Sequence, residues 1–187
     1  MDDITKMTKE AESKFGPVDI LICNAGLAKP CMFMEDGLLE MSKMEMDLNY
    51  FGTQKCVSAI GKQMAYRGKG HILVVGTACS YTFVPGYPGY TGSKFAQRGF
   101  VETIRHELRQ YGVYVHLFLP GTIDTPGLKL EGETKSSLAW DIEGNSTCMT
   151  ADEAAQICIK GMKEGRYQYT SEAFLDLLLI PSAGNAG

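Results

Sequence analysis

The sequence predicts an α/β fold in which parallel strands form a doubly wound sheet with helices on both faces. Two observations predict it: short apolar runs alternate with stretches of helical period, and each run ends in a turn. This alternation is typical of βαβ units, whose strands are buried on both faces. With 44% hydrophobic and 21% charged residues, the 187-residue chain has the composition of a globular domain, which excludes disorder and a coiled coil.

The N-terminal part is predicted to hold two helices on either side of a strand. Residues 1–15 carry apolar residues at three- and four-residue spacing, and Gly16-Pro17 ends this helix. The run Ile20–Cys23 predicts a strand that is buried on both faces. Helical period returns from Leu38 to Met64.

The alternation continues through the middle of the chain. Strands are predicted over residues 71–75 and 113–119, with a helix from Tyr90 to Tyr111 between them. Residues 121–148 are polar and predicted to be irregular. Thr150 and Glu153 have the spacing of a capping box, which predicts a helix start, and a last amphipathic segment is predicted over 171–180.

Three predicted strands make a small parallel sheet whose apolar edge would be uncovered. We therefore expect residues 1–187 to form one N-terminally truncated domain, the second half of a doubly wound sheet whose first strands are missing.

Charge and cysteine usage exclude several kinds of site. The 18 basic and 22 acidic residues give a net charge of −4 without a basic cluster, so no nucleic-acid partner is expected. The six cysteines are scattered without a C-x-x-C pair, so no metal site is expected and a reducing compartment is indicated. We see no targeting segment and no apolar run of the ~18 residues that a spanning helix needs.

Candidate functional residues follow each of the predicted strands. Asn24 follows the first strand, Thr77 the second, and Pro120-Gly121 the third. Since the carboxyl ends of parallel strands meet at one edge of the sheet, these residues are expected to lie together. Tyr90 and Lys94, four residues apart, would share one face of the following helix, where a cation beside a phenol lowers its pKa for acid–base work.

Four motifs carry a resemblance to a known family. CNAG after a strand, LNYFGT in a helix, YTGSK, and PGTIDT after the next strand resemble the short-chain dehydrogenase/reductase family in order and spacing. The resemblance implies a Rossmann-like sheet. It also implies that Tyr90 is the catalytic acid/base, that Lys94 tunes its pKa and touches the cofactor ribose, and that Asn49 holds a water in a proton relay.

The same resemblance implies a nicotinamide cofactor, with NADPH preferred. It places two groups of residues beside the cofactor: Asn24, Ala25 and Gly26, and then Pro120, Gly121, Ile123 and Thr125. The family's Gly-rich phosphate-binding turn is not found in this sequence, which is why we expect a truncated domain.

The second catalytic hydroxyl is left open between two residues. The family has a Ser thirteen residues before its Tyr, and here that position is Thr77, which we favour over Ser80. Thr supplies the same donor and acceptor as Ser, with an added methyl group.

Within the family, GPVDILICNAG, YTGSKFAQRGFVETIRHEL, DTPG and the stretch around TCMTADEAAQ resemble the members that reduce the 3-keto group of a sphingoid base. This narrower resemblance implies reduction of 3-ketosphinganine to sphinganine in sphingolipid synthesis. It also implies association with the cytoplasmic side of the endoplasmic reticulum membrane, and the family implies homo-oligomers. Two alternatives are kept: a catalytically silent fragment or interaction module, and a dehydrogenase acting on a steroid or retinoid.

Overall fold

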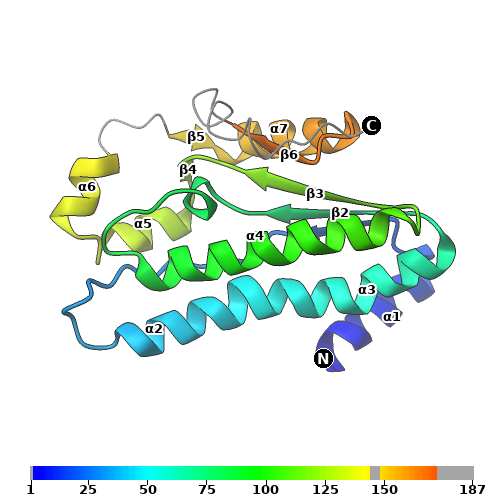
Figure 1. Ribbon diagram of the computed structural model, residues 1–187, viewed down its shortest axis with the longest axis horizontal. Helices are drawn as coiled ribbons and strands as arrows, with labels where there is room; N and C mark the ends of the chain where they lie inside the picture. Colours follow the sequence, from blue (N-terminus) through cyan, green and yellow to red (C-terminus); the bar gives the residue numbers. More distant parts are fainter. Residues whose placement is uncertain (1, 144–147, 172–187) are drawn as a thin grey trace.

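A four-stranded parallel sheet forms the centre of the protein in the computed structural model, which describes residues 2–143 and 148–171 (Figure 1). The strands lie in the order β1-β2-β3-β6. Their bounds are β1 (Ile20–Cys23), β2 (Gly70–Val75), β3 (Val113–Leu119) and β6 (Gln168–Thr170). The first three confirm the predicted strands, and the parallel sheet flanked by helices confirms the predicted fold class.

Two long helices cover one face of the sheet. These are α3 (Thr53–Arg67) and α4 (Pro88–Arg109), which run side by side below the strands in Figure 1. Their inward side chains, among them Ile60, Met64 and Val101, form one core cluster with Ile72, Val74 and other strand residues. Burial of these aliphatic side chains, each stabilising by about 1.5–3 kcal/mol, holds the helices against the sheet.

The opposite face packs against α7 (Ala151–Lys163), through a second cluster that includes Leu73, Phe118 and Met162. Because residues of both faces are covered, β2 and β3 are almost continuously apolar, as predicted. Thr150 caps α7 with the full capping box, its hydroxyl accepting from the Glu153 N–H, which confirms the predicted helix start.

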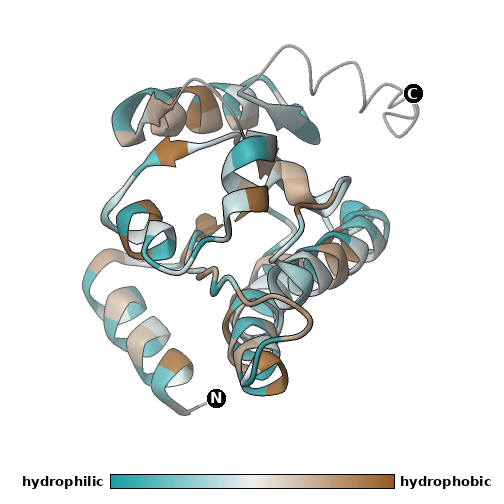
Figure 2. Ribbon diagram, turned by 90° about the vertical axis from the view of Figure 1, so that its left-hand side faces the viewer, coloured by the Kyte–Doolittle hydropathy of each residue, from teal (hydrophilic) through white to brown (hydrophobic). Residues whose placement is uncertain are grey.

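The predicted helix over residues 38–64 is divided into three parts. It consists of α2 (Leu38–Glu45), a π-helical turn (Met46–Gly52) and α3, which follow one another without a loop. The N-terminal helix α1 (Asp2–Phe15) lies against α3. Figure 2 shows hydrophilic and hydrophobic residues mixed along α1, and Phe15 is 87% exposed, so the predicted apolar stripe of this helix is only partly buried.

The region after Pro120 is more regular than the sequence indicated. It forms β4 (Ile123–Asp124), α5 (Pro126–Gly132), α6 (Ser137–Glu143) and β5 (Met149–Thr150), and β4 pairs with β5 in a separate parallel pair. The prediction of an irregular segment is therefore wrong, and the short strand β6 was missed. The predicted segment 171–180 lies outside the described residues beyond Ser171. In the described part of the chain, no helix is long and apolar enough to cross a membrane.

Candidate active site

The carboxyl ends of the three long strands meet at one edge of the sheet. Thr77 follows β2 and Pro120 follows β3, and the Ala78 N–H donates to the Pro120 carbonyl at 3.3 Å. Asn24 follows β1 and is exposed at the same edge. Parallel topology thus brings together residues that are far apart in the sequence.

Tyr90 and Lys94 come from the first turns of α4, which begins at Pro88 directly after the loop that follows the short 3-10 turn Ala78–Ser80. Pro at the start of a helix is favourable, because its fixed φ suits the first turn and no backbone donor is lost. The Lys94 ammonium lies 5.8 Å from the centre of the Tyr90 ring. The Thr77 hydroxyl lies near enough to the Tyr90 phenol to lower its pKa, so three of the predicted residues are assembled.

The pKa of the Tyr90 phenol shifts in the direction opposite to the prediction. Burial raises the pKa of Tyr90 above its ordinary value near 10, the neighbouring Cys79 adds to this, and only Thr77 opposes it. The expected lowering by Lys94 is not seen: Lys94 is not among the groups that shift this pKa, and desolvation of the phenolate is the largest cause. Burial likewise lowers the pKa of Lys94 to about 8.

Two protein groups hold the Lys94 ammonium in place. It donates to the Val75 carbonyl at the end of β2 and to Gln97 Oε1, each at 3.3 Å. The lysine is only 4% exposed, so these contacts replace water around the charge. The cation is therefore fixed beside the Tyr90 ring.

The structure places Ser80 differently from Thr77. Ser80 is 1% exposed and its hydroxyl oxygen is buried without a hydrogen-bond partner in the described chain. Thr77 is partly accessible, accepts from the Cys79 N–H at 3.3 Å and lies near enough to the Tyr90 phenol to lower its pKa. The geometry favours Thr77, and its catalytic role stays a prediction.

Asn49 lies in the π-helical turn and is fully buried. Its Oδ1 accepts from the Leu27 N–H, and its Nδ2 donates to the Leu27 carbonyl and to Ser93 Oγ, all at 2.9 Å. In the π turn the Asn49 backbone carbonyl accepts hydrogen bonds from two side chains, the Gln97 amide at 2.8 Å and the Thr53 hydroxyl at 2.9 Å. Asn49 therefore joins α4 to the loop after β1, and the predicted water relay stays a prediction.

The loop that follows β1 runs close to Asn49 and Lys94, two of the candidate catalytic residues. A Cβ atom on Gly26 would lie 3.2 Å from Asn49 Oδ1 and 3.5 Å from Lys94 Nζ, so glycine lets the backbone approach both. Asn24, Ala25 and Gly26 are all exposed, leaving this backbone open in front of Lys94.

The second predicted cofactor segment lies after β3. The Gly121 N–H donates to Ser171 Oγ at 3.0 Å, Ile123 belongs to β4, and Thr125 caps α5 by accepting from the Leu128 N–H at 3.1 Å. Thr125 thus has a structural bond in addition to any contact with a cofactor. Pro120 is buried where β3 ends, at the same edge as Thr77.

Sequence reasoning missed several buried polar residues of the site. Ser93 and Gln97 are 0% and 1% exposed and tie α4 to the π turn, as described above. Ser93 lies three residues after Tyr90 and Gln97 three residues after Lys94, which was a readable signal because this spacing places them on the same helix face. Glu45 is also buried at 1% exposure, and its Oε1 accepts from the Lys29 N–H at 2.8 Å.

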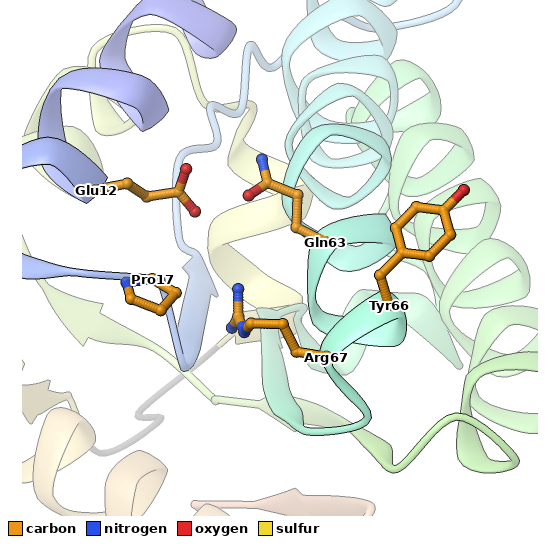
Figure 3. A pocket seen from close by; sticks show the side chains of 5 residues that line it. All are labelled: Glu12, Pro17, Gln63, Tyr66 and Arg67. Carbon is orange, nitrogen blue, oxygen red and sulfur yellow. The ribbon is translucent and has the colours of Figure 1, made fainter.

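A separate hollow lies at the other end of the sheet. Figure 3 shows Glu12 and Pro17 facing Gln63, Tyr66 and Arg67 of α3, around a cavity of about 410 Å³. Arg67 donates there to the Val18 carbonyl, just before β1 begins. Because it lies at the amino end of the strands, this hollow is not part of the catalytic group.

A parallel sheet with helices on both faces, together with Tyr90, Lys94, Thr77 and Asn49, is the arrangement of a short-chain oxidoreductase. The chain belongs to the family described as short chain dehydrogenase, whose sequence model matches residues 1–136.

Within this family, the chain is similar to reductases that are named for a sphingoid substrate. The chain is 34% identical over 176 residues to the 3-ketodihydrosphingosine reductase of Dictyostelium discoideum, covering 93% of this chain and 52% of that protein. It is 32% identical over 164 residues to the 3-dehydrosphinganine reductase of Danio rerio, covering 88% of this chain and 49% of that protein. The chain therefore spans about half the length of the curated relatives it matches.

Solved structures agree with the fold. A short chain dehydrogenase from Burkholderia cenocepacia J2315 in complex with NADP superposes with a TM-score of 0.76 at 25% identity, over 98% of this chain and 72% of that chain. A gluconate 5-dehydrogenase from the same organism, in complex with NADP and tartrate, gives a TM-score of 0.76 at 19% identity, over 93% of this chain and 71% of that chain.

Proposed function

We propose that this protein contributes the catalytic side of an NADPH-dependent reductase that converts 3-ketosphinganine to sphinganine. The observation that carries the proposal is the Tyr90 phenol, which has Thr77 as a neighbour and whose ring centre lies 5.8 Å from the Lys94 ammonium at the carboxyl edge of the sheet. The names of the similar reductases support the substrate, and the NADP complexes of similar structures support the cofactor.

Tyr90 is the proton donor in this proposal. When bound, the dihydronicotinamide supplies a hydride to the carbonyl carbon, and the carbonyl oxygen must then gain a proton. A pKa raised by burial keeps Tyr90 protonated at neutral pH, which suits donation to a ketone rather than abstraction from an alcohol. The Thr77 hydroxyl is a second donor that stabilises the developing negative charge on oxygen.

The residues present fit a nicotinamide. The backbone at Asn24–Gly26 is exposed, and Gly26 carries no side chain toward the Lys94 ammonium, which in this proposal donates to a ribose hydroxyl. Pro120, Gly121 and Ile123 would border the ring from the end of β3, with Thr125 nearby. These residues hold the cofactor in the proposal; the hydroxyls of Tyr90 and Thr77 hold the ketone oxygen.

The deciding experiment combines cofactor binding with turnover. NADPH is titrated into the purified 187-residue chain and followed by nicotinamide fluorescence, and 3-ketosphinganine is then added. We expect saturable binding, and we expect Tyr90→Phe to abolish reduction while binding persists. Tyr66→Phe is the matched control, because Tyr66 is 90% exposed and lies on α3 beside the hollow of Figure 3.

Each other result has its own meaning. No binding at millimolar NADPH would favour the silent fragment or interaction module. Reduction of a steroid or retinoid ketone in place of 3-ketosphinganine would overturn the substrate, and full activity of Tyr90→Phe would overturn the mechanism.

Lys94 gives the proposal a pH signature. Its pKa of about 8 means that the ammonium loses its proton as the pH rises through that value. We expect the reduction rate to fall across that range, between about pH 7 and about pH 9. A rate that stays constant there would show that the charge on Lys94 is not needed.

The location of the protein is proposed on the resemblance alone. We propose that the full-length parent associates with the cytoplasmic side of the endoplasmic reticulum membrane and forms homo-oligomers. Fractionation of cells that express the tagged full-length parent tests the first, and sedimentation tests the second.

A further inference from the structure

Large apolar side chains are exposed on three segments at the end of the molecule that holds Tyr90. Residues 31–37 belong to the connection after β1, residues 81–87 to the connection after β2, and residues 136–141 form the start of α6. Figure 1 places these segments together at its left-hand end, and Figure 2 looks onto that end. We call their exposed apolar side chains the apolar rim; they are Phe33, Met34, Phe83, Leu138 and Trp140.

The three segments contact one another, so the apolar rim is one surface. The Cys31 N–H donates to the Gly86 carbonyl at 2.8 Å, which joins the first segment to the second. A Cβ atom on Gly86 would lie 3.3 Å from Met32 Sδ and 3.3 Å from Ser136 Oγ, so the third segment meets the other two at the same point. Every residue of the apolar rim is within four positions of Met32, Gly86 or Ser136 in the sequence.

The exposure of these side chains indicates a binding surface. Phe33, Met34 and Phe83 are 80%, 89% and 75% exposed. Single exposed apolar side chains are common on soluble proteins, whereas a group of them on adjoining segments marks a surface that binds something. Trp140 is half-exposed, and the buried Lys135 ammonium lies 4.4 Å from the centre of its ring. An indole with both apolar and polar surroundings is typical of the boundary between lipid and water.

The charges beside the apolar rim identify the kind of surface it fits. Glu35 and Asp36 lie in the first segment and Asp141 in the third, and all three are exposed. The sequences of the three segments contain no other charged residue. The apolar rim therefore has no basic side chain to attract anionic headgroups, and its apolar area suits a bilayer of zwitterionic lipid.

We propose that the apolar rim docks on the surface of a zwitterionic lipid bilayer, with its side chains at the boundary between headgroups and acyl chains. Gly86 lies four residues before Tyr90, and the Tyr87 and Tyr90 ring centres are 6.2 Å apart, so the docked surface adjoins the candidate active site. A long-chain ketone in the bilayer then reaches Tyr90 without crossing water.

The proposal rests on the proposed function for the substrate that is collected in this way. It also assigns the proposed membrane association to a defined surface of this chain. The docking itself needs neither a nucleotide nor a ketone, so it is measured separately from reduction.

Trp140 is the one tryptophan in the sequence, so its fluorescence reports on the apolar rim directly. The purified 187-residue chain is mixed with phosphatidylcholine vesicles, and binding is followed by flotation and by Trp140 emission. We expect the chain to float with the vesicles and the emission to shift to shorter wavelength. We also expect lipids brominated on their acyl chains to quench it.

Substitutions in the apolar rim test which side chains enter the lipid. Phe33→Ser and Phe83→Ser should each lower the vesicle partition coefficient about tenfold, because a phenyl ring is lost from the lipid contact, and Phe33→Leu should retain binding. Phe15→Ser is the matched control: Phe15 is 87% exposed but ends α1, before β1 begins, and its loss should leave binding unchanged. Circular dichroism checks folding; if a variant does not fold, quenching of Trp140 in the unmodified chain decides the matter.

Several results would overturn the proposal. These are absence of flotation, flotation without quenching of Trp140, equal losses from Phe33→Ser and Phe15→Ser, and binding to phosphatidylserine vesicles only. An emission shift that grows with protein concentration without vesicles, together with dimers in sedimentation, would show that the apolar rim is an interface between copies of the chain.

Failure of this proposal is distinguishable from failure of the proposed function. A chain that binds vesicles but reduces no ketone would refute the proposed function and leave the docking surface in place. A chain that reduces a short-chain, water-soluble ketone but binds no vesicles would refute the docking surface alone.

Discussion

Replacing Asn49 by Ala tests whether the π-helical turn organises the site. The side chain makes three hydrogen bonds of 2.9 Å, two partly buried ones to Leu27 and a buried one to Ser93. Each contributes about 1 kcal/mol net, so we expect Asn49→Ala to lower the free energy of unfolding by about 3 kcal/mol. For a chain of this size that corresponds to a fall in melting temperature of roughly 6–12 °C.

Urea denaturation followed by circular dichroism measures the change. The midpoint should fall while the dependence on urea concentration stays constant, because the compactness of the unfolded chain is unaffected. Asn24→Ala is the control, since that side chain is exposed at the same edge, and it should change stability by less than about 0.5 kcal/mol. A loss below about 1 kcal/mol for Asn49→Ala would refute the view that this residue ties the loop to α4.

Three further variants follow from individual contacts. Thr77→Ala should slow ketone reduction about 100-fold, whereas Ser80→Ala should leave the rate unchanged, because Thr77 and not Ser80 neighbours the Tyr90 phenol. Kinetics with the reverse order would assign the hydroxyl to Ser80. Burial raises the pKa of Glu45 to about 7, so the folded state binds a proton that the unfolded state loses near pH 4.5, and stability declines as the pH rises between these values. Glu45→Gln should therefore raise the melting temperature at pH above about 7 and leave it unchanged near pH 4, and equal melting curves at both would contradict the burial argument. A Cβ on Gly89 would lie 2.2 Å from Glu45 Oε2 and 2.8 Å from Ser42 Cα. Gly89→Ala should therefore destabilise the packing of α4 on α2 by about 2 kcal/mol in a thermal melt. Gly92→Ala is the control and should be neutral or stabilising, because a Cβ there meets open space.

Much of the sheet could be predicted because its strands are buried on both faces. Ile20–Cys23 and Val113–Leu119 are apolar runs bounded by turns, and the structure places strands there. The three-residue strand Gln168–Thr170 carries no such run, and only its pairing with β3 makes it a strand. Thr125 followed by Pro126 has the pattern of a helix start. The segment was nevertheless predicted to be irregular because its composition is polar.

The site was predicted less completely than the fold. Helical spacing related Tyr90 to Lys94, and strand ends located Thr77 and Asn24, but periodicity gives no sign of a π turn at Asn49. The direction of the Tyr90 pKa shift also could not be predicted. It depends on desolvation, which follows from how tightly surrounding elements pack and not from the charge four residues away.

The hydrogen bonds that join Asn49 to Leu27, Ser93 and Gln97 link residues 22 to 48 positions apart in the sequence. Long loops must close before any of these bonds can form, whereas α4 itself needs only local contacts. During refolding, helical content is therefore expected to recover before the Asn49, Ser93 and Gln97 contacts are made. The candidate active site would therefore assemble late in folding. Recovery of reductase activity would show that the parallel strands have paired in their final order.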